Sequence, residues 1–160
     1  NLKAHSRDLT KEAALDLIRQ NVRGGILDLA WIERTLRDAS LRDTARLLES
    51  FLNHELPCLL EDSPLKPKQS FHSHQTRTVT TVLGPITLRR AYYRSPQSGR
   101  YPLDEALGLH DQYTPAVVQF MRWAGAMDNS FELASETLRR FAGLTIPGRQ
   151  VQRVVNAFGR

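Results

Sequence analysis

The sequence predicts an α+β protein that is mostly α-helical. Apolar residues recur every three to four positions towards both ends of the chain, while residues 78–83 are nearly all β-branched and residues 86–94 form a second extended run. The 160 residues suffice for one ordinary domain or two small ones. We expect a helical N-terminal module over 1–62, a basic β-ribbon over 63–112 and a helical unit over 113–160.

The N-terminal module is predicted to be a set of packed helices. Thr10 is placed to cap a first helix that ends at Gly24–Gly25, and apolar residues repeat at helical spacing over 26–36 and again over 41–56, up to Pro57. Their remaining positions mix charges of both signs, as on solvated helices. We expect packing here, and dimerisation of two copies, rather than chemistry.

The middle segment is predicted to be a linker over 62–75 followed by a β-ribbon. Gly84–Pro85 is the expected two-residue turn between its strands. Residues 63–102 carry seven basic and no acidic side chains, interleaved with tyrosines, which suits binding to a phosphate backbone. The alternative is an edge hairpin that its charge keeps soluble. The candidate contacts are Lys66, Lys68, Arg77, Arg89, Arg90, Arg94 and Arg100.

The C-terminal segment is predicted to hold three helices. The first begins at Thr114–Pro115, with a capping hydroxyl, and runs to about Met127; the second spans about 130–143 and the third opens at Pro147. A tight turn before the last helix predicts a helix-turn-helix. The residues expected to point inward are Phe131, Ala134, Leu138 and Phe141 on the second helix, and Val151, Val154, Val155 and Phe158 on the third.

In a helix-turn-helix the last helix lies in the major groove, where arginine and glutamine read base edges and Gly148 would let the backbone approach. The candidate base contacts are Arg149, Gln150, Gln152 and Arg153, and the candidate phosphate contacts are Arg139 and Arg140. The alternative is a structural three-helix domain whose arginines are only solvated. Charge reversal at Arg149 and Arg153 is expected to relax sequence preference, whereas reversal at Arg89 and Arg90 should weaken binding to every sequence.

Neither metal nor catalysis is expected. Residues 95–99 have the frame of a zinc knuckle, Cys-Pro-x-Cys-Gly, with serine at both ligand positions, and a hydroxyl cannot replace a thiolate at structural zinc. No cofactor motif, nucleophile–base pair or phosphate-cradling glycine loop is present in the sequence. The single cysteine, Cys58, suits a reducing cytoplasm, and no apolar run approaches the length of a membrane span.

Two stretches have specific motifs: residues 80–99 contain Arg-Arg-Ala-Tyr-Tyr, and residues 101–109 contain Pro-Leu-Asp-Glu-Ala-Leu-Gly-Leu. Both closely resemble the N-terminal region of insertion-sequence transposases of the ISKra type. Residues 130–134 and 151–154 fit the same family's helical segment. The resemblance implies a region that recognises the ends of the element, with a zinc ribbon and a helix-turn-helix, ahead of a separate RNase-H-like catalytic domain.

The sequence departs from that family at the serines of residues 95–99, and we expect no catalytic domain on this chain. We therefore expect a protein with a degenerate zinc ribbon that binds double-stranded DNA without catalysis: a transposase fragment or a domesticated relative, in the cytoplasm at the bacterial nucleoid, working in a larger nucleoprotein complex. The alternative is an interaction module in which the ribbon and Tyr92, Tyr93 and Tyr101 bind RNA or an acidic protein.

Overall fold

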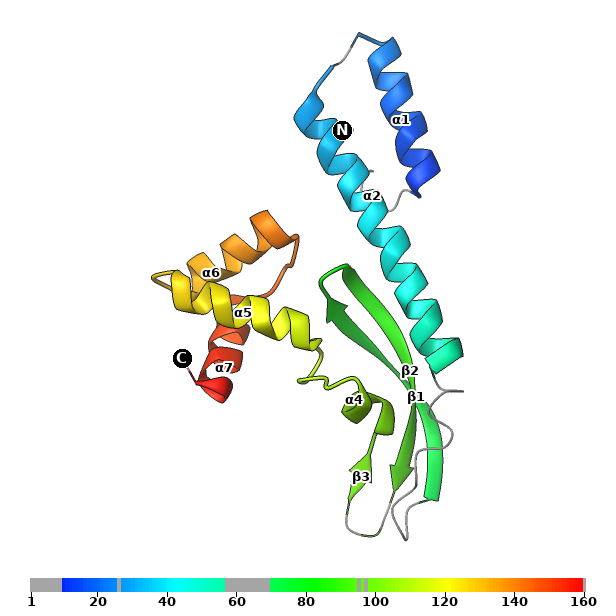
Figure 1. The fold of residues 1–160 in the computed structure, drawn as a ribbon, viewed down its shortest axis with the longest axis vertical. Helices are drawn as coiled ribbons and strands as arrows, with labels where there is room; N and C mark the ends of the chain where they lie inside the picture. The colour runs from blue at the N-terminus through cyan, green and yellow to red at the C-terminus, as the bar shows by residue number, and fades with distance from the viewer. Residues whose placement is uncertain (1–9, 26, 57–69, 95, 97, 160) are drawn as a thin grey trace. The chain divides into compact units, whose positions relative to one another are not determined.

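The computed structural model describes residues 10–25, 27–56, 70–94, 96 and 98–159 (Figure 1). These residues form an α+β structure that is mostly helical, with one three-stranded antiparallel sheet in the order β1-β2-β3, so the predicted class is confirmed. The chain divides into two compact units, Asn1–Leu48 and Glu49–Arg160. No helix among the described residues is both long and apolar enough to cross a lipid bilayer.

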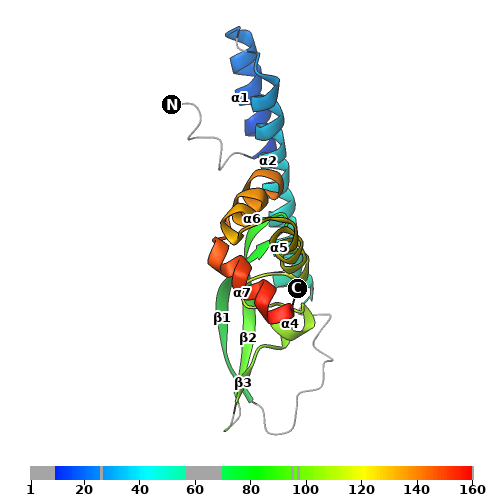
Figure 2. The ribbon, with the colours of Figure 1, turned by 90° about the vertical axis from the view of Figure 1, so that its left-hand side faces the viewer.

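The first unit contains α1 (Lys11–Arg23) and most of α2 (Leu29–Ser50), which lie side by side (Figures 1 and 2). Thr10 caps α1 as predicted, because its hydroxyl accepts a hydrogen bond from the backbone N–H of Ala13 at 3.3 Å. Two separate apolar repeats were predicted over 26–36 and 41–56, but Leu29–Ser50 is one uninterrupted helix, α2, which continues into a π-helical turn, η2 (Phe51–Glu55).

The second unit contains a ribbon of two long antiparallel strands, β1 (Ser70–Thr81) and β2 (Gly84–Arg94). The predicted linker over 62–75 is wrong for residues 70–75, which are already strand, while the rest of it lies outside the described residues. The early start of β1 was not apparent from the residue types, because serine, glutamine and histidine are weak strand formers. These residues are extended because they pair with β2.

The turn of the ribbon lies two residues earlier than predicted, at Val82–Leu83 rather than at Gly84–Pro85. Thr81 and Gly84 form the closing pair, and the Thr81 hydroxyl both donates to the Gly84 carbonyl at 2.8 Å and accepts from the Leu83 N–H at 3.1 Å. These two bonds fix the turn without an Asn-Gly sequence. Gly84 supplies the backbone conformation that other residues avoid, with a φ of 129°.

Two further elements were not predicted from the sequence. The short strand β3 (Gly99–Arg100) pairs with the end of β2. The short helix α4 (Pro102–Ala106) packs against β2 and buries Leu103. A proline at the first helical position and acidic residues in the first turn were the available sequence signals for α4.

Three helices complete the second unit: α5 (Pro115–Met127), α6 (Phe131–Thr137), which continues as the π-helical turn η3 (Leu138–Ala142), and α7 (Gly148–Phe158). Their starts and ends agree with the sequence prediction. Ser130 caps α6 through a 3.1 Å bond from the Leu133 N–H. Thr114 occupies the N-cap position of α5, but its hydroxyl makes no capping bond, so that part of the prediction is wrong.

The three helices share one apolar core. Two of the residues predicted to face it do not: Phe141 is 78% exposed and Phe158 is 46% exposed. Because the π-helical turn adds a residue to the end of α6, Phe141 is rotated away from the face that Leu138 occupies. The core residues are Tyr113, Val117, Val118, Met121, Ala124, Ala134, Leu138, Leu144, Ile146, Val151, Val154 and Val155.

The ribbon and the three-helix part are joined by backbone hydrogen bonds beside the turn. The N–H of Thr80 donates to the carbonyl of Gln112 at 2.7 Å, and the N–H of Thr114 donates to the carbonyl of Thr80 at 3.2 Å. Tyr113 lies between these bonds and is 2% exposed. The segment before α5 therefore acts as a short strand against the outer edge of β1, which fixes where α5 begins.

Candidate nucleic-acid interface

The helix α7 separates a buried valine face from an exposed polar face. Val151, Val154 and Val155 lie in the core. Four polar side chains are exposed at the spacing of one helical face, and they are Arg149, Gln152, Arg153 and Asn156. Three of them were predicted from the sequence; Asn156 was missed, although it lies seven residues after Arg149 and so belongs to the same stripe. The predicted Gln150 is half-buried.

The start of α7 is held close to α6. The Ser135 hydroxyl donates to the carbonyl of Ile146 at 2.6 Å, just before the helix begins. A Cβ atom on Gly148 would lie 2.8 Å from the carbonyl oxygen of Phe131, nearer than real Cβ atoms come to backbone. Packing between α6 and α7 thus requires a small residue at 148, a reason that the sequence interpretation, close approach to DNA, did not include.

One cation of the α7 stripe is already paired. The guanidinium of Arg153 donates to the carboxylate of Asp111, in the segment that leads into α5. Asp111 has a φ of 52°, in the left-handed region that asparagine and aspartate tolerate best among residues with a side chain. Both side chains are about half exposed, so water screens the pair and a phosphate can compete with Asp111 for Arg153.

The two arginines predicted to contact phosphates share a carboxylate of their own helix. The Nε and Nη2 atoms of Arg139 donate to the Glu136 carboxylate at 2.7 and 2.6 Å, and Arg140 donates to the same side chain. Bonding to Arg139, and then to Arg140, lowers the pKa of Glu136 from 4.5 to about 2. At neutral pH these three residues carry a net charge of one positive unit, not two.

One of the predicted ribbon contacts, Arg90, belongs to the interior. Arg90 is 5% exposed and donates to the carboxylate of Asp104 on α4, while Arg77 lies 3.8 Å from the same carboxylate. The guanidinium of Arg90 also sits over the ring of Tyr101 at 4.1 Å. Arg90 therefore forms a buried structural ion pair with Asp104, and the prediction that Arg90 contacts DNA is wrong.

Arg100 is compensated as well, by a two-pronged pair with Glu105 at 3.0 and 2.9 Å. Residues 63–102 contain no acidic side chain, as counted. However, α4 carries Asp104 and Glu105, whose carboxylates pair with arginines of that stretch. Arg89 and Arg94 are exposed, and no carboxylate within the described residues pairs with either. The predicted contacts Lys66 and Lys68 lie outside the described residues.

The tyrosines of the ribbon differ in their surroundings. The rings of Tyr92 and Tyr101 are 4.9 Å apart, on the same face as Arg90. A Cβ on Gly99 would lie 2.0 Å from the Tyr92 hydroxyl, so this strand crosses directly over the ring. Tyr93 lies on the opposite face, against Phe71 at 6.0 Å. Tyr92 and Tyr101 are thus packing groups, and Tyr93 belongs to the exposed face of the ribbon.

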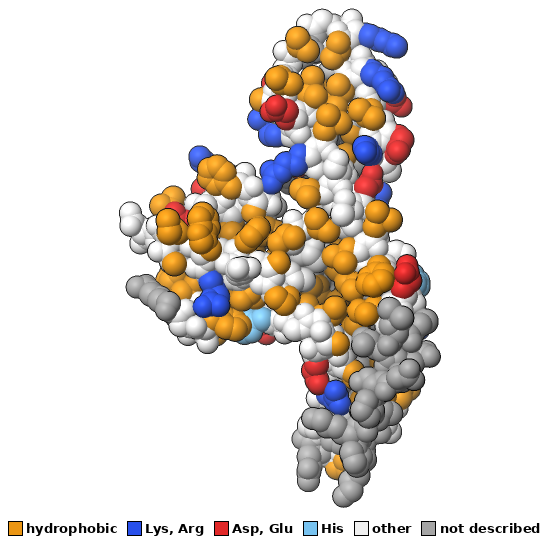
Figure 3. All heavy atoms as spheres, viewed as in Figure 1, with side chains coloured by type: hydrophobic (Ala, Val, Ile, Leu, Met, Phe, Trp, Pro, Cys, Tyr) orange, Lys and Arg blue, Asp and Glu red, His pale blue; other side chains and the backbone are white. Residues whose placement is uncertain are grey.

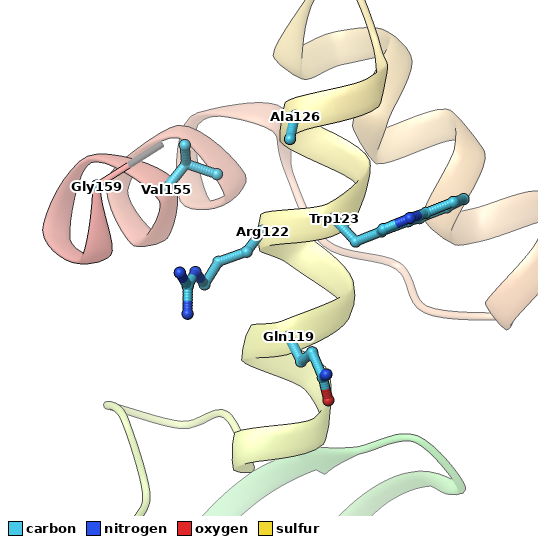
Figure 4. Close-up of a pocket in the computed structure, with 6 residues that line it drawn as sticks. All are labelled: Gln119, Arg122, Trp123, Ala126, Val155 and Gly159. Carbon is cyan, nitrogen blue, oxygen red and sulfur yellow. The ribbon is translucent and has the colours of Figure 1, made fainter.

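An open hollow of about 330 Å³ lies between α5 and the end of α7 (Figure 4). Arg122 extends from α5 towards the end of α7, and its guanidinium carbon lies 5.5 Å from the centre of the Phe158 ring. Arg122 therefore lies against the C-terminal end of α7, at Val155 and Phe158. The hollow is lined by Gln119, Arg122, Trp123, Ala126, Val155 and Gly159.

No metal site emerges from the described part of the chain, where no three His, Cys, Asp or Glu side chains come close enough together to hold an ion. Ser95 of the knuckle frame and Cys58 both lie outside it. His72 and His74 lie on β1 beside aromatic rings, at 5.7 Å from Tyr92 and 5.1 Å from Phe71 respectively.

Comparison with known proteins places the chain in a family. Residues 27–158, well over half of its length, match the family model of UPF0236, described as an uncharacterised protein family. The chain belongs to UPF0236. The matched region contains α2, the ribbon and the helices α5, α6 and α7, so the described residues of the candidate interface lie inside the part that defines the family.

Two UPF0236 proteins of Caldanaerobacter subterraneus subsp. tengcongensis are each 35% identical to this chain over 80 residues. Those residues make up 48% of this chain, but only 17% and 16% of the two relatives. The UPF0236 chain therefore spans less than a fifth of the length of these relatives.

Proposed function

We propose that this UPF0236 chain binds double-stranded DNA, with α7 in the major groove. The observation that carries the proposal is the polar stripe Arg149, Gln152, Arg153 and Asn156, which stands opposite the buried valines of the same helix. Arginine binds guanine O6 and N7 with two hydrogen bonds, and glutamine or asparagine does the same for adenine. No carboxylate within the described residues pairs with Arg149.

The surroundings of α7 support a helix-turn-helix mode of binding. The preceding helix ends at Gly143 with a left-handed φ of 70°, and a short connection leads to α7, which crosses α5 closely at Gly125. Arg139 and Arg140 at the end of α6, and Arg122 on α5, lie on the two helices that flank α7. We assign these three arginines to phosphate contacts, which orient the helix without reading sequence.

The resemblance to ISKra-type transposases supports a more specific form of this proposal. In it, the chain is the DNA-recognition region of a transposase or of a domesticated descendant, acts at the bacterial nucleoid and recognises element ends or a regulatory site. The ribbon would then be a zinc ribbon that has lost its metal, since serines stand at both knuckle positions, 95 and 98.

Two exposed apolar surfaces support self-association and a larger nucleoprotein complex. In the first unit Leu29 and Leu47 are 65% and 72% exposed, which favours a homodimer through α1 and α2. In the second unit Trp123 and Met127 are more than half exposed, and hydrophobic side chains gather over α5 in Figure 3. We assign the α5 surface to contacts with further subunits.

The test is binding of a duplex library to the purified chain across a range of salt concentrations. Specific and non-specific binding should both weaken as salt rises, with a log–log slope of roughly −0.9 per phosphate contacted. Arg149→Ala together with Gln152→Ala should reduce discrimination among sequences, while Arg139→Ala with Arg140→Ala should weaken all duplexes alike. Salt-independent binding, or equal effects of the two double variants on discrimination, would contradict the proposal.

The matched control is Arg19→Ala with Arg46→Ala, two exposed arginines of the first unit that pair only weakly with neighbouring carboxylates. This control removes two positive charges, as Arg139→Ala with Arg140→Ala does. If it lowers duplex affinity as much as Arg139→Ala with Arg140→Ala does, then net charge rather than a defined surface governs binding.

A further inference from the structure

The exposed face of the ribbon is distinct from the α7 surface in both shape and chemistry. Ile86, Leu88 and Arg90 turn one face of β2 inward, so the residues between them occupy the outer face. The register sets these residues beside their partners on β1 as a ladder of cross-strand pairs. The pairs are Thr78–Thr87, Thr76–Arg89, His74–Ala91 and Phe71–Tyr93.

Aromatic rings cluster at the end of this ladder that is farther from the turn. The ring of Phe71 stands edge-on to Tyr93 at 6.0 Å with an interplanar angle of 75°, and lies 5.1 Å from the ring of His74. Despite these neighbours Phe71 is 53% exposed. A large aromatic side chain is thus held in a defined position on the surface, where burial does not explain it.

Charge on the outer face is positive without compensation from the strands. Neither β1 nor β2 contains an aspartate or glutamate. Arg89 is exposed two rungs from the Phe71–Tyr93 pair, about 13 to 14 Å along the strand. The carboxylate of Glu49 does approach the ribbon, but at the backbone of Thr87, towards the turn. The part of the outer face away from the turn therefore combines the aromatic pair Phe71–Tyr93 with the positive charge of Arg89.

We propose that this outer face binds single-stranded DNA, with a base stacked on Phe71 beside Tyr93 and the backbone near Arg89. Exposed rings on a positively charged β-surface are an arrangement that binds unpaired bases, because every base presents a flat π face. A duplex hides those faces in its stack, so the face and the α7 stripe select different forms of nucleic acid. The choice of DNA over RNA rests on the proposed function of α7.

The experiment measures fluorescence anisotropy of a labelled oligo-dT strand and of a labelled duplex with the full chain at low salt. The parent should bind oligo-dT, and Phe71→Ala should weaken that binding on the order of tenfold or more, since it removes one stacking partner. Duplex binding should stay within twofold of the parent. Phe71→Trp should retain or strengthen oligo-dT binding, which a merely structural role for this position would not predict.

Phe141→Ala is the matched control, because it removes another exposed phenylalanine, on η3, far from the ribbon in sequence. It should leave oligo-dT binding unchanged. The proposal is overturned if the parent does not bind oligo-dT, if Phe71→Ala binds it as the parent does, or if oligo-rU is bound more tightly than oligo-dT. Loss of duplex binding in the α7 variants with oligo-dT binding intact would separate failure at one surface from failure at the other.

Discussion

Asp104 on α4 accepts a hydrogen bond from Arg90, whose side chain is 6% exposed beneath the central strand of the sheet. Tyr101 covers the other side of that guanidinium at 4.1 Å. A buried charge is tolerated only when it is paired, so this contact decides that α4 packs against β2. It also removes Arg90 from the set of residues that a ligand can reach.

Replacement of Asp104 by asparagine should destabilise the second unit by about 3 kcal/mol, because it leaves the buried Arg90 without its counter-charge. The measurement is urea unfolding followed by circular dichroism. Glu105→Gln is the control, since Glu105 neighbours Asp104 on α4 but its side chain is half exposed. Its cost should stay below about 1 kcal/mol. Equal losses from the two substitutions would contradict a buried structural pair.

Asp111→Asn should raise the affinity for duplex DNA severalfold at low salt and by less at high salt. The change frees Arg153 from its carboxylate, and asparagine tolerates the left-handed conformation at this position, so the fold is retained. Fluorescence anisotropy with one duplex over a salt series provides the measurement. Glu132→Gln removes a charge from the same unit and serves as control; a gain of the same size there would mean that the Arg153 pair has no special part in binding.

Much of the fold could be predicted because its signals are local. The caps at Thr10 and Ser130, the valine period of α7 and the β-branched run of β1 each depend on neighbouring residues. The turn could not be located in this way. Gly84–Pro85 has the composition of a turn, but pairing of the buried Val79 with the buried Ile86 across the ribbon sets the register and moves the turn to residues 82–83.

The candidate site was predicted less well than the fold, because pairing between distant charges is invisible in a sequence count. Residues 63–102 contain no acid, yet once the chain folds Asp104 pairs with Arg77 and Arg90, and Glu105 pairs with Arg100. Exposure of the α7 stripe was predictable, since the helical period that buries the valines fixes what lies opposite them.

Acid should expose the contribution of Glu136 to stability. Because its pKa in the folded chain is about 2 and its ordinary value is 4.5, pairing with Arg139 and Arg140 stabilises the fold above about pH 4.5. This contribution disappears as the pH falls towards 2. The free energies of unfolding of the parent and of Glu136→Gln should therefore approach each other as the pH falls over this range. In the variant Arg139→Gln with Arg140→Gln, the pKa of Glu136 should return towards its ordinary value, as measured by a carboxyl NMR titration. An unchanged pKa would refute the two arginines as the cause of the shift.

Gly148→Ala should destabilise the three-helix part by about 2 kcal/mol, since the new methyl group would press on the backbone of Phe131. Thermal unfolding measures the effect. Asn156→Ala, on the exposed stripe of the same helix, is the control and should change stability by less than about 0.5 kcal/mol. If Gly148→Ala instead leaves stability unchanged but weakens duplex binding, the glycine serves approach to DNA and the packing explanation fails.

Asn53→Ala should loosen the ribbon at the edge of β2 that β3 leaves uncovered. The Asn53 side chain accepts from the Arg89 N–H at 2.8 Å and donates to the Thr87 carbonyl at 2.7 Å, so one amide replaces a neighbouring strand. Loss of both bonds should speed hydrogen exchange at the Arg89 amide and cost about 2 kcal/mol. Ser50→Ala, one turn earlier and exposed, should change neither quantity. Because Arg89 is also the cation of the proposed single-strand surface, Asn53→Ala should weaken oligo-dT binding more than duplex binding.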